Sequence, residues 1–302
     1  MRLGFHVSVA GGLQDAVVRA LRRRCQTLQV FAAAPSRWKR RDADPAEDAW
    51  FVEARRHHDL HPLFVHAPYL LNPATDDERL WVRSRDVLQQ EIETANRWRA
   101  AGVIIHLGSA GQQPKGDAVA PVCTALDEVR AATDGSAKII LENSAGQGRS
   151  VGSSMAEIGT IIRSAGRERL AVCLDTAHAF AAGYAVNTKD GLARMLDEAD
   201  SEFGLAMVEV IHLNGSKSEL GSHVDRHAGI GQGHIGRDGF KTILTEPRLN
   251  ELPFIMETPK SSDSALEDDL TNLRRVRRLL PANLRPPLPP QFKNITLYSA
   301  EA

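Results

Sequence analysis

Short apolar segments alternate with longer amphipathic segments along the whole chain. The apolar segments are rich in Val, Ile, Leu and Phe and are flanked by turn residues, which is typical of strands buried on both faces. These predicted strands cover residues 3–7, 27–31, 63–65, 103–105, 138–141, 170–174, 208–211 and 253–256. The helical segments cover residues 13–23, 45–57, 76–100, 119–131, 154–163, 189–200, 238–244 and 264–280.

Strands that are separated by helices pair in parallel, and eight such units are the number that closes a barrel. The sequence therefore predicts an α/β fold, a single-domain TIM (β/α)8 barrel, over residues 1–282. An open doubly wound sheet is the alternative, but it should carry a glycine-rich phosphate turn after an early strand, and Gly11-Gly12 is not that pattern. The proline-rich tail, residues 283–302, is predicted to be an extended segment beyond the barrel that contributes little to the fold.

The composition fits one barrel in a reducing compartment. The chain has 302 residues, of which 42% are hydrophobic and 25% charged, so it can bury a large core. Its 3 cysteines are too few and too scattered for a disulfide framework or a thiolate zinc site. No apolar signal segment precedes the first strand, and no segment approaches the length of a membrane span. We therefore expect a cytoplasmic monomer without a membrane partner.

The formal net charge of -1 argues against a permanent basic patch. It does not exclude nucleic acid as a partner, because bound divalent cations would shift the balance of charge considerably.

Imidazoles and carboxylates stand where most of the predicted strands end. In a TIM barrel the carboxyl ends of all strands lie on one rim, and the active sites of this fold are built there. One histidine at a strand end is usually a hydrogen-bonded rim residue. Chance is a poor explanation, however, when most of the strand ends carry an imidazole or a carboxylate. The pattern favours a metal site made from His66, His106, Glu142, Asp175 with His178, His212 and Glu257, with His6 either a ligand or a residue that orients one.

The segment after the seventh strand adds two candidate ligands. Asp225 and His227 are two residues apart, so in an extended backbone their side chains point to the same side and can bind one metal ion. Alone, this pair is weak evidence, and a solvated polar loop is the better explanation of it. Asn143 and Asn214 follow candidate ligands closely and are suited to orient them.

Longer motifs surround these positions. They are GFHVSVAGG (residues 4–12), VHAPYL (65–70), LENSAGQG (141–148), CLDTAHAFAAGY (173–184), HLN (212–214) and VDRH (224–227). Together they resemble the endonuclease IV family of apurinic/apyrimidinic (AP) endonucleases, from residue 3 to about residue 280.

This resemblance implies a zinc-dependent enzyme of base excision repair that hydrolyses the DNA phosphodiester 5′ to an abasic site and leaves a 3′-hydroxyl. It implies about three Zn²⁺ ions per chain, with Mn²⁺ as an alternative at the most oxygen-rich position. The substrate would be double-stranded DNA that contains abasic sites. By position, His66 and His106 would hold one ion and Glu142 would bridge it to a second ion held by Asp175, His212 and Glu257, while His178, Asp225 and His227 would hold the third. Glu142 and Glu257 would also act as catalytic carboxylates that handle protons.

The same resemblance implies DNA-binding roles for Tyr69 and Arg37. Tyr69 matches a position from which the family fills the gap left by the missing base, although an aromatic ring packed on the rim is an equal alternative. In the run AAAPSRW (32–38), Ser36 stands where an arginine is usual, and Arg37 is the nearest cation. Arg37 would either brace the bent duplex or belong to a solvated basic turn that touches phosphates. Gly215 also departs from the family, which usually has Asp there.

Two other classes of function remain open. A sugar isomerase or epimerase of the same barrel superfamily would need only Glu142, Asp175, His212 and Glu257, and it would leave the remaining candidate ligands without a role. A binding module would keep the zinc cluster only to grip damaged DNA. Incision of an abasic-site duplex by metal-replete protein separates these interpretations.

Overall fold

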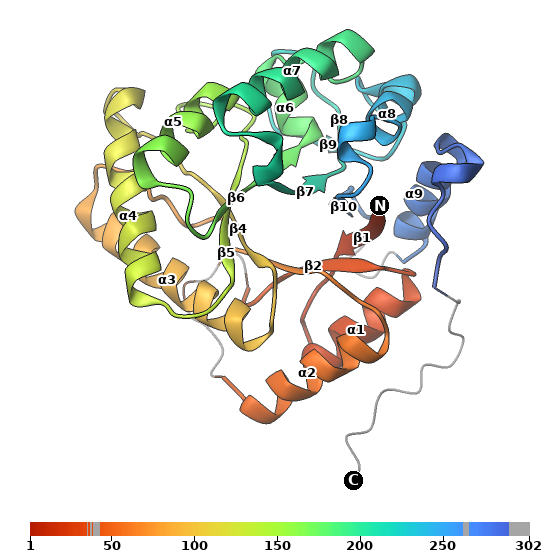
Figure 1. Cartoon of the computed structure of the whole chain (residues 1–302), viewed down its shortest axis with the longest axis horizontal. Helices are drawn as coiled ribbons and strands as arrows, with labels where there is room; N and C mark the ends of the chain where they lie inside the picture. The colour runs from red at the N-terminus through yellow and green to blue at the C-terminus, as the bar shows by residue number, and fades with distance from the viewer. Residues whose placement is uncertain (35, 37, 39–42, 262–265, 290–302) are drawn as a thin grey trace.

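The computed structural model describes residues 1–34, 36, 38, 43–261 and 266–289, and within them a closed barrel of eight parallel strands forms the centre (Figure 1). Strand β1 pairs with β10 as well as with β2, which closes the sheet. This confirms the predicted TIM barrel and excludes the open doubly wound sheet. The barrel strands are β1 Arg2–His6, β2 Thr27–Phe31, β3 Leu63–His66, β4 Gly102–His106, β5 Lys138–Glu142, β6 Leu170–Asp175, β7 Val208–His212 and β10 Pro253–Met256.

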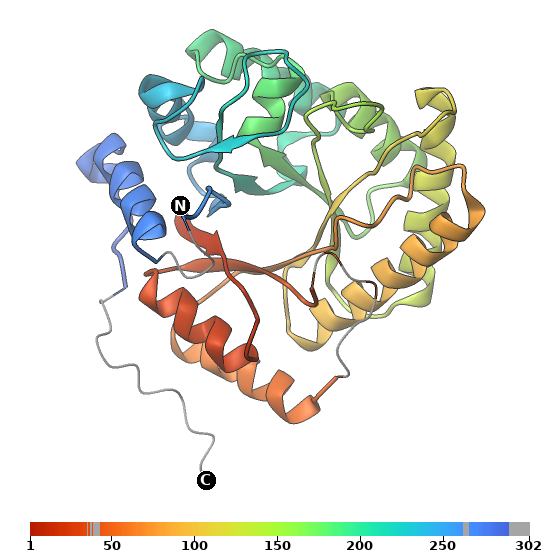
Figure 2. The same ribbon diagram turned by 180° about the vertical axis from the view of Figure 1, so that it is seen from behind.

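Helices surround the barrel on its outside, as both faces of the molecule show (Figure 2). The predicted helices are confirmed with small shifts at their ends; for example, α3 begins after Asp77, whose side chain accepts a hydrogen bond from Leu80 N at 2.9 Å. They are α1 Leu13–Arg22, α2 Pro45–His57, α3 Glu78–Arg97, α4 Val119–Ala132, α5 Met155–Ala165, α7 Lys189–Glu202, α8 Gly236–Leu244 and α9 Leu266–Leu279. Short 3₁₀ turns are η1 Lys115–Ala118, η2 Leu205–Met207, η3 Pro247–Leu249 and η4 Ala282–Leu284.

Two short features at the carboxyl rim were not predicted. Helix α6, Thr176–Ala182, begins directly after β6, because the Asp175 side chain accepts from His178 N at 2.8 Å and so caps the helix. Strands β8, Gly215–Ser216, and β9, His227–Ala228, form a small antiparallel pair. Elements this short carry no recognisable period of apolar residues, so the sequence pattern does not reveal them.

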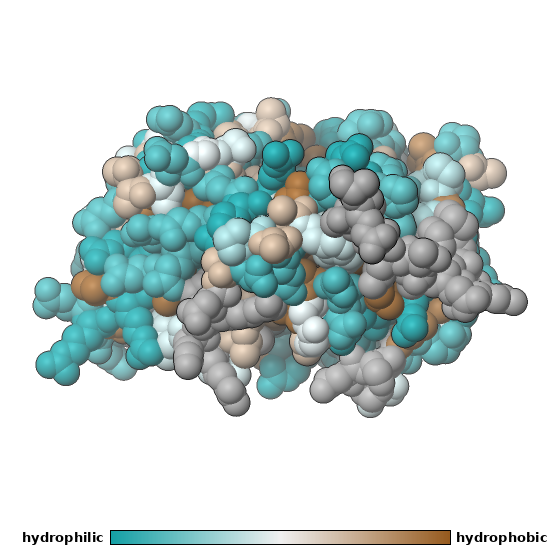
Figure 3. All heavy atoms as spheres, turned by 90° about the horizontal axis from the view of Figure 1, so that it is seen from below, coloured by the Kyte–Doolittle hydropathy of each residue, from teal (hydrophilic) through white to brown (hydrophobic). Residues whose placement is uncertain are grey.

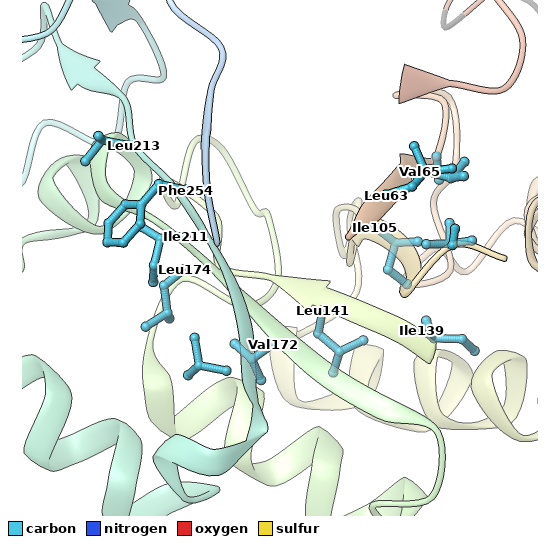
Figure 4. Close-up of a cluster of buried hydrophobic side chains, with 14 of the residues drawn as sticks. Leu63, Val65, Ile105, Ile139, Leu141, Val172, Leu174, Ile211, Leu213 and Phe254 are labelled. Carbon is cyan, nitrogen blue, oxygen red and sulfur yellow. The ribbon is translucent and has the colours of Figure 1, made fainter. Parts of the chain in front are cut away.

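The described apolar side chains form a core inside the barrel and a second core between the barrel and the helices. Successive side chains of a strand point to opposite sides, so each strand contributes to both cores. In the outer core, Val65 lies near Ile105 of the neighbouring strand, and Leu174 lies beside Ile211 of its own neighbouring strand (Figure 4). The inner core consists of Phe64, Ile104, Ile140, Ala171, Cys173, Val210 and Ile255.

This alternation explains why the strand ends carry the chemistry. A residue two positions beyond an inner-core residue points into the barrel again, one layer closer to the carboxyl rim. Phe64 is thus followed by His66 and Ile140 by Glu142. The same step leads from Ile104 to His106, from Cys173 to Asp175, from Val210 to His212 and from Ile255 to Glu257.

The first part of the tail lies against the outside of the barrel. Leu284 and Leu288 are partly buried against the outer core. The carbonyl of Pro287 accepts a hydrogen bond from Gln26 Nε2 at 3.0 Å, and that of Pro289 accepts from Arg24 Nε at 2.9 Å. Prolines lack an N–H, but their carbonyls remain acceptors, so a proline-rich segment can still be tied to a surface. The expectation of a tail beyond the barrel is therefore wrong for residues 284–289, while the boundary at residue 283 stays a prediction.

The face of the molecule seen in Figure 3 is mostly hydrophilic where the structure describes it, with small apolar patches among the polar side chains. Within the described ranges, no helix is both long and apolar enough to cross a membrane. Cys25, Cys123 and Cys173 are buried and form no disulfide, as their spacing predicted.

Candidate metal centre

Imidazoles and carboxylates from six barrel strands meet at the carboxyl rim. The candidate ligand atoms of His66, His106 and Glu142 lie within 4.8 Å of one another. A second group with the same spacing contains Glu142, Asp175, His212 and Glu257. The structure thus assembles the first two groups of residues as the sequence suggested, and each group is large enough to coordinate one ion.

The carboxylate of Glu142 lies between these two groups. Its Oε2 atom is 3.2 Å from His66 Nε2 and 3.6 Å from His106 Nε2. Its Oε1 atom is 2.9 Å from His212 Nδ1. Glu142 is only 1% exposed, so its two oxygens face the two groups and not the solvent. This is the geometry of a carboxylate that bridges two cations.

A third group lies on the solvent side, where the β8–β9 pair brings Asp225 over α6. His178 Nε2 is 3.2 Å from Asp225 Oδ2, and His227 Nε2 is 3.3 Å from Asp225 Oδ1. Asp175 also approaches this group, since its Oδ2 atom lies 3.8 Å from His227 Nε2. All nine residues expected at a metal site are therefore together on one face of the barrel.

Hydrogen bonds fix the orientation of several imidazoles. The Nδ1–H groups of His66 and His178 donate to the carbonyls of Ala67 and Asn143 at 2.7 and 2.9 Å. His227 Nδ1 similarly faces the carbonyl of Glu257 at 3.3 Å. In each case Nε2 is left facing a carboxylate. Histidines that bind metals usually have their second nitrogen held in this way.

One orphaned atom shows that a cation fits the third group. His227 Nε2 is buried and has no hydrogen-bond partner among the residues that the structure describes. A buried nitrogen without a partner is costly, but the lone pair of an imidazole directed at two carboxylates is what a metal ion requires. Nitrogen and oxygen donors of this kind suit Zn²⁺, and the more oxygen-rich second group also suits Mn²⁺.

Two asparagine amides hold the carboxylates in place. Asn214 Nδ2 donates to Asp175 Oδ2 at 2.7 Å, and Asn214 Oδ1 accepts from Glu257 N at 2.8 Å. Asn143 Oδ1 accepts from Asp175 N at 2.6 Å. Both amides are fully buried. They orient candidate ligands, as their positions in the sequence suggested.

The groups in the centre shift one another's protonation. Burial alone would raise the pKa of Glu142, but His106 and His212 outweigh it and hold that pKa well below its usual range. Burial alone would lower the pKa of His178, but Asp175, Asp225 and Glu142 outweigh it and hold that pKa well above its usual range. Without a metal ion, these pKa shifts favour the ionised form of Glu142 and the protonated form of His178.

Two buried residues at the centre were missed by the sequence interpretation. Cys173 lies in the inner core with its sulfur near Glu142 and His212, and burial raises its pKa to about 12. Gln29 lies on β2 and contacts His212 and Glu257. A glutamine inside the apolar strand TLQVF was a visible signal, because polar residues buried in a strand usually have a specific partner.

His6 contacts a candidate ligand and does not join a candidate metal group within the described part of the chain. Its Nδ1 atom lies 3.3 Å from Glu257 Oε1 and 2.9 Å from Gln29 Nε2. This position fits the second of its two predicted roles, a residue that orients a ligand.

Tyr69 stands beside the centre and is 63% exposed. Its ring packs edge-on against Phe31, with ring centroids 5.2 Å apart. It borders a cavity of about 520 Å³ that reaches His106, His178 and Asp225. The same cavity is lined by the polar side chains of Asn72, Ser109, Ser144, Gln147 and Ser150.

The predicted recognition loop is covered only in part. Arg37 lies outside the described residues, so its two interpretations remain open.

The structure explains why a glycine stands at position 215. A Cβ atom at this position would lie 2.9 Å from the carbonyl oxygen of Gly229, so the chain just after β9 approaches too closely for a side chain.

Comparisons with known proteins agree with this geometry. The family described as "Xylose isomerase-like TIM barrel" matches residues 20–279. The "Probable endonuclease 4" of Halothermothrix orenii is 39% identical over 276 residues, which cover 91% of this chain and 99% of that protein. The crystal structure of endonuclease IV from Thermus thermophilus has a TM-score of 0.80 and 35% identity, and the match covers 92% of this chain and 98% of that one. A D-tagatose 3-epimerase-like protein, with 17% identity and a TM-score of 0.68 over 92% of this chain and 98% of that one, shares the fold.

Proposed function

The chain belongs to the endonuclease IV family, and we propose that it is a zinc-dependent AP endonuclease that hydrolyses the DNA phosphodiester 5′ to an abasic site. The reaction leaves a 3′-hydroxyl and belongs to base excision repair. The observation that carries this proposal is the meeting of nine imidazole and carboxylate residues, Glu142 among them, on one face of the barrel.

About three Zn²⁺ ions fit the ligands that the chain offers. His66 and His106 would hold the first ion, and Asp175, His212 and Glu257 would hold the second. Glu142 would serve both of these ions, and His178, Asp225 and His227 would hold the third. The ions would supply Lewis acidity toward the phosphate and lower the pKa of the hydrolytic water.

Glu142 and Glu257 are the proposed catalytic carboxylates. Burial alone would raise the pKa of Glu257, but His212, His6 and His66 outweigh it and hold that pKa well below its usual range. Both carboxylates are therefore ionised near neutral pH and can accept a proton during the reaction. Because the described side chains of the centre include no activated nucleophile, water is the group that attacks phosphorus in this proposal.

The cavity beside Tyr69 suits the backbone of a nucleotide without its base. Its hydroxyl and amide groups can donate hydrogen bonds to sugar and phosphate oxygens. An abasic nucleotide leaves the duplex at low cost, because its stacking has already been lost. Tyr69 is the side chain that we propose to enter the gap that remains, and Arg37 is the proposed cation on the other recognition loop. We place the enzyme in the cytoplasm as a monomer.

The alternative of a sugar isomerase or epimerase is not favoured. Such an enzyme would leave His66, His106, His178, Asp225 and His227 without a role, although all of them reach the centre. The identity with relatives named endonuclease 4 is also far higher than that with the epimerase-like structure.

The test is incision of a duplex that contains one abasic site by zinc-loaded protein. We expect a single cut 5′ to the lesion whose 3′ end can be extended by a polymerase, no cut in the intact duplex of the same sequence, and loss of incision after chelation. Binding without incision by protein that retains its zinc would instead identify a binding module and overturn the proposal.

A further inference from the structure

We infer that Gln29 is a positioning residue that holds both His212 and Glu257 in the orientation needed to bind metal. The inference rests on the proposed function in one respect, namely that these two residues are ligands of the second ion. Strand β2, on which Gln29 lies, carries no imidazole or carboxylate of its own over its fully described length.

The amide of Gln29 is fully buried and makes a separate contact with each ligand. Its Oε1 atom accepts a hydrogen bond from His212 Nε2 at 2.7 Å. Its Nε2 atom donates to Glu257 Oε1 at 2.6 Å and lies 2.9 Å from His6 Nδ1. Gln29 is 0% exposed, so water does not compete for these bonds.

The contact to His212 selects one form of the imidazole. Because Gln29 offers an oxygen to Nε2, the proton of neutral His212 resides on Nε2. The lone pair is then on Nδ1, which is the atom that faces Glu142 Oε1 at 2.9 Å and Glu257 Oε2 at 3.4 Å. His212 thus offers Nδ1 to the second ion, whereas His66 and His178 have Nε2 facing the centre.

The contact to Glu257 needs the opposite half of the amide. Glu257 Oε1 accepts the Gln29 N–H, and this leaves Oε2 on the side of His212 Nδ1. An amide has an acceptor and a donor in one rigid plane, so it can serve an imidazole N–H and a carboxylate at once. A carboxylate at this position would lack the donor, and an aliphatic side chain would lack both.

The topology shows why a long side chain is required. In the closed barrel, β1 lies between β2 and β10, and β10 lies between β1 and β7. Gln29 therefore reaches across the mouth of the barrel to ligands on two strands that do not pair with its own. Asparagine, one methylene shorter, would keep the chemistry of the amide but could not contact both ligands.

The test compares zinc affinity in variants of two buried glutamines. Gln29→Met keeps the length of the side chain and removes the hydrogen bonds to His212 and Glu257. Gln29→Asn keeps the amide but makes the side chain too short to contact both residues. Gln26→Met is the matched control, because Gln26 is a buried amide just before the same strand whose bonds go to Leu3 N and Pro287 O. Zinc affinity would be measured by competition with a chromophoric chelator, with folding followed by circular dichroism.

We expect both Gln29 variants to bind zinc roughly 10–100-fold more weakly than the parent protein, and Gln26→Met to bind it normally. In the zinc-loaded parent, the Nε2 proton of His212 should also give a slowly exchanging imidazole signal in NMR spectra, and Gln29→Met should lose it. Unchanged affinity and an unchanged signal in Gln29→Met, or an equal loss of affinity in Gln26→Met, would overturn the role of Gln29. A parent protein that holds no zinc and does not incise would instead overturn the proposed function.

Discussion

The Nδ1 atom of His212 lies 2.9 Å from Oε1 of Glu142, and the other oxygen of the same carboxylate lies 3.2 Å from His66 Nε2. One side chain thus faces two groups of ligands that come from different sides of the barrel. Replacing Glu142 should affect both groups at once, whereas replacing a ligand of the third group, on the solvent side, should not.

Glu142→Gln should therefore reduce incision by roughly 100-fold or more, because an amide cannot bridge two cations as a carboxylate does. Zinc content should fall in parallel. His227→Ala, which removes a ligand of the third group only, should retain zinc in the other two groups and some activity. Elemental analysis and single-turnover incision would measure these effects, and near-normal turnover by Glu142→Gln would rule out the hydrolytic mechanism.

Zinc affinity should increase as the pH rises from about 6 to about 8. In the metal-free protein, burial alone would lower the pKa values of His178 and His212. Asp175, Asp225 and Glu142 outweigh this effect at His178, and Cys173, Glu257 and Glu142 outweigh it at His212, so both pKa values are held well above the usual range. Zinc binds only the neutral imidazole, so below these pKa values each ion must displace protons. Chelator competition at several pH values would show the rise together with proton release, and an affinity independent of pH would contradict the predicted protonation of the metal-free centre.

The tail residues that lie on the barrel should contribute to stability. A chain that ends at residue 285 should unfold more readily than one that ends at residue 289, by about 1–3 kcal/mol, because it loses the acceptors for Gln26 and Arg24 and the packing of Leu288. The difference between the two truncated proteins, measured by urea denaturation, reports on residues 286–289 alone. Equal midpoints would show that these contacts are energetically neutral.

Tyr69→Ala should weaken binding to an abasic-site duplex by about 1–3 kcal/mol, with little change for the intact duplex. The side chain is exposed beside the cavity and has an aromatic face to stack in a gap. Tyr69→Phe is the control, because it retains the ring, and it should bind almost normally. If Tyr69→Ala bound both duplexes as the parent does, the ring would be only a packed residue of the rim.

Arg37→Ala separates the two interpretations of the altered recognition loop. A side chain that braces the gap should cost roughly 1–3 kcal/mol of abasic-site binding and leave intact duplex unaffected. A phosphate contact should weaken both and lower the salt dependence by about one ion. Arg163→Ala, which removes an arginine paired with Glu202 on the outside of the barrel, is the control in filter-binding titrations. Equal losses on the two duplexes would exclude the bracing role.

The sequence predicted the barrel and most of the centre because one rule governs both. The alternation of side chains along a strand places Phe64 in the inner core and His66 above it, and the same two-residue step recurs on the other ligand strands. Strand ends can therefore be interpreted without knowledge of how the strands pair.

The parts that could not be predicted depend on contacts between distant segments. The role of Gln29 requires knowing that β10 and β7 lie two and three strands away from β2 around the closed barrel, which no local pattern contains. The approach of Asp175 to His227 likewise depends on how the β8–β9 pair folds over α6. The docking of residues 284–289 was missed because proline-rich segments without a helical or strand period are usually treated as linkers.

The order of the strands also bears on how the enzyme is made. His66, His106 and Glu142 are translated early, but Glu257 follows directly on β10, the last barrel strand to leave the ribosome. Since β10 also pairs with β1 and closes the sheet, the last ligand and the closed barrel arrive together. A nascent or prematurely terminated chain that lacks β10 therefore lacks both the candidate ligand Glu257 and the pairing with β1 that closes the barrel.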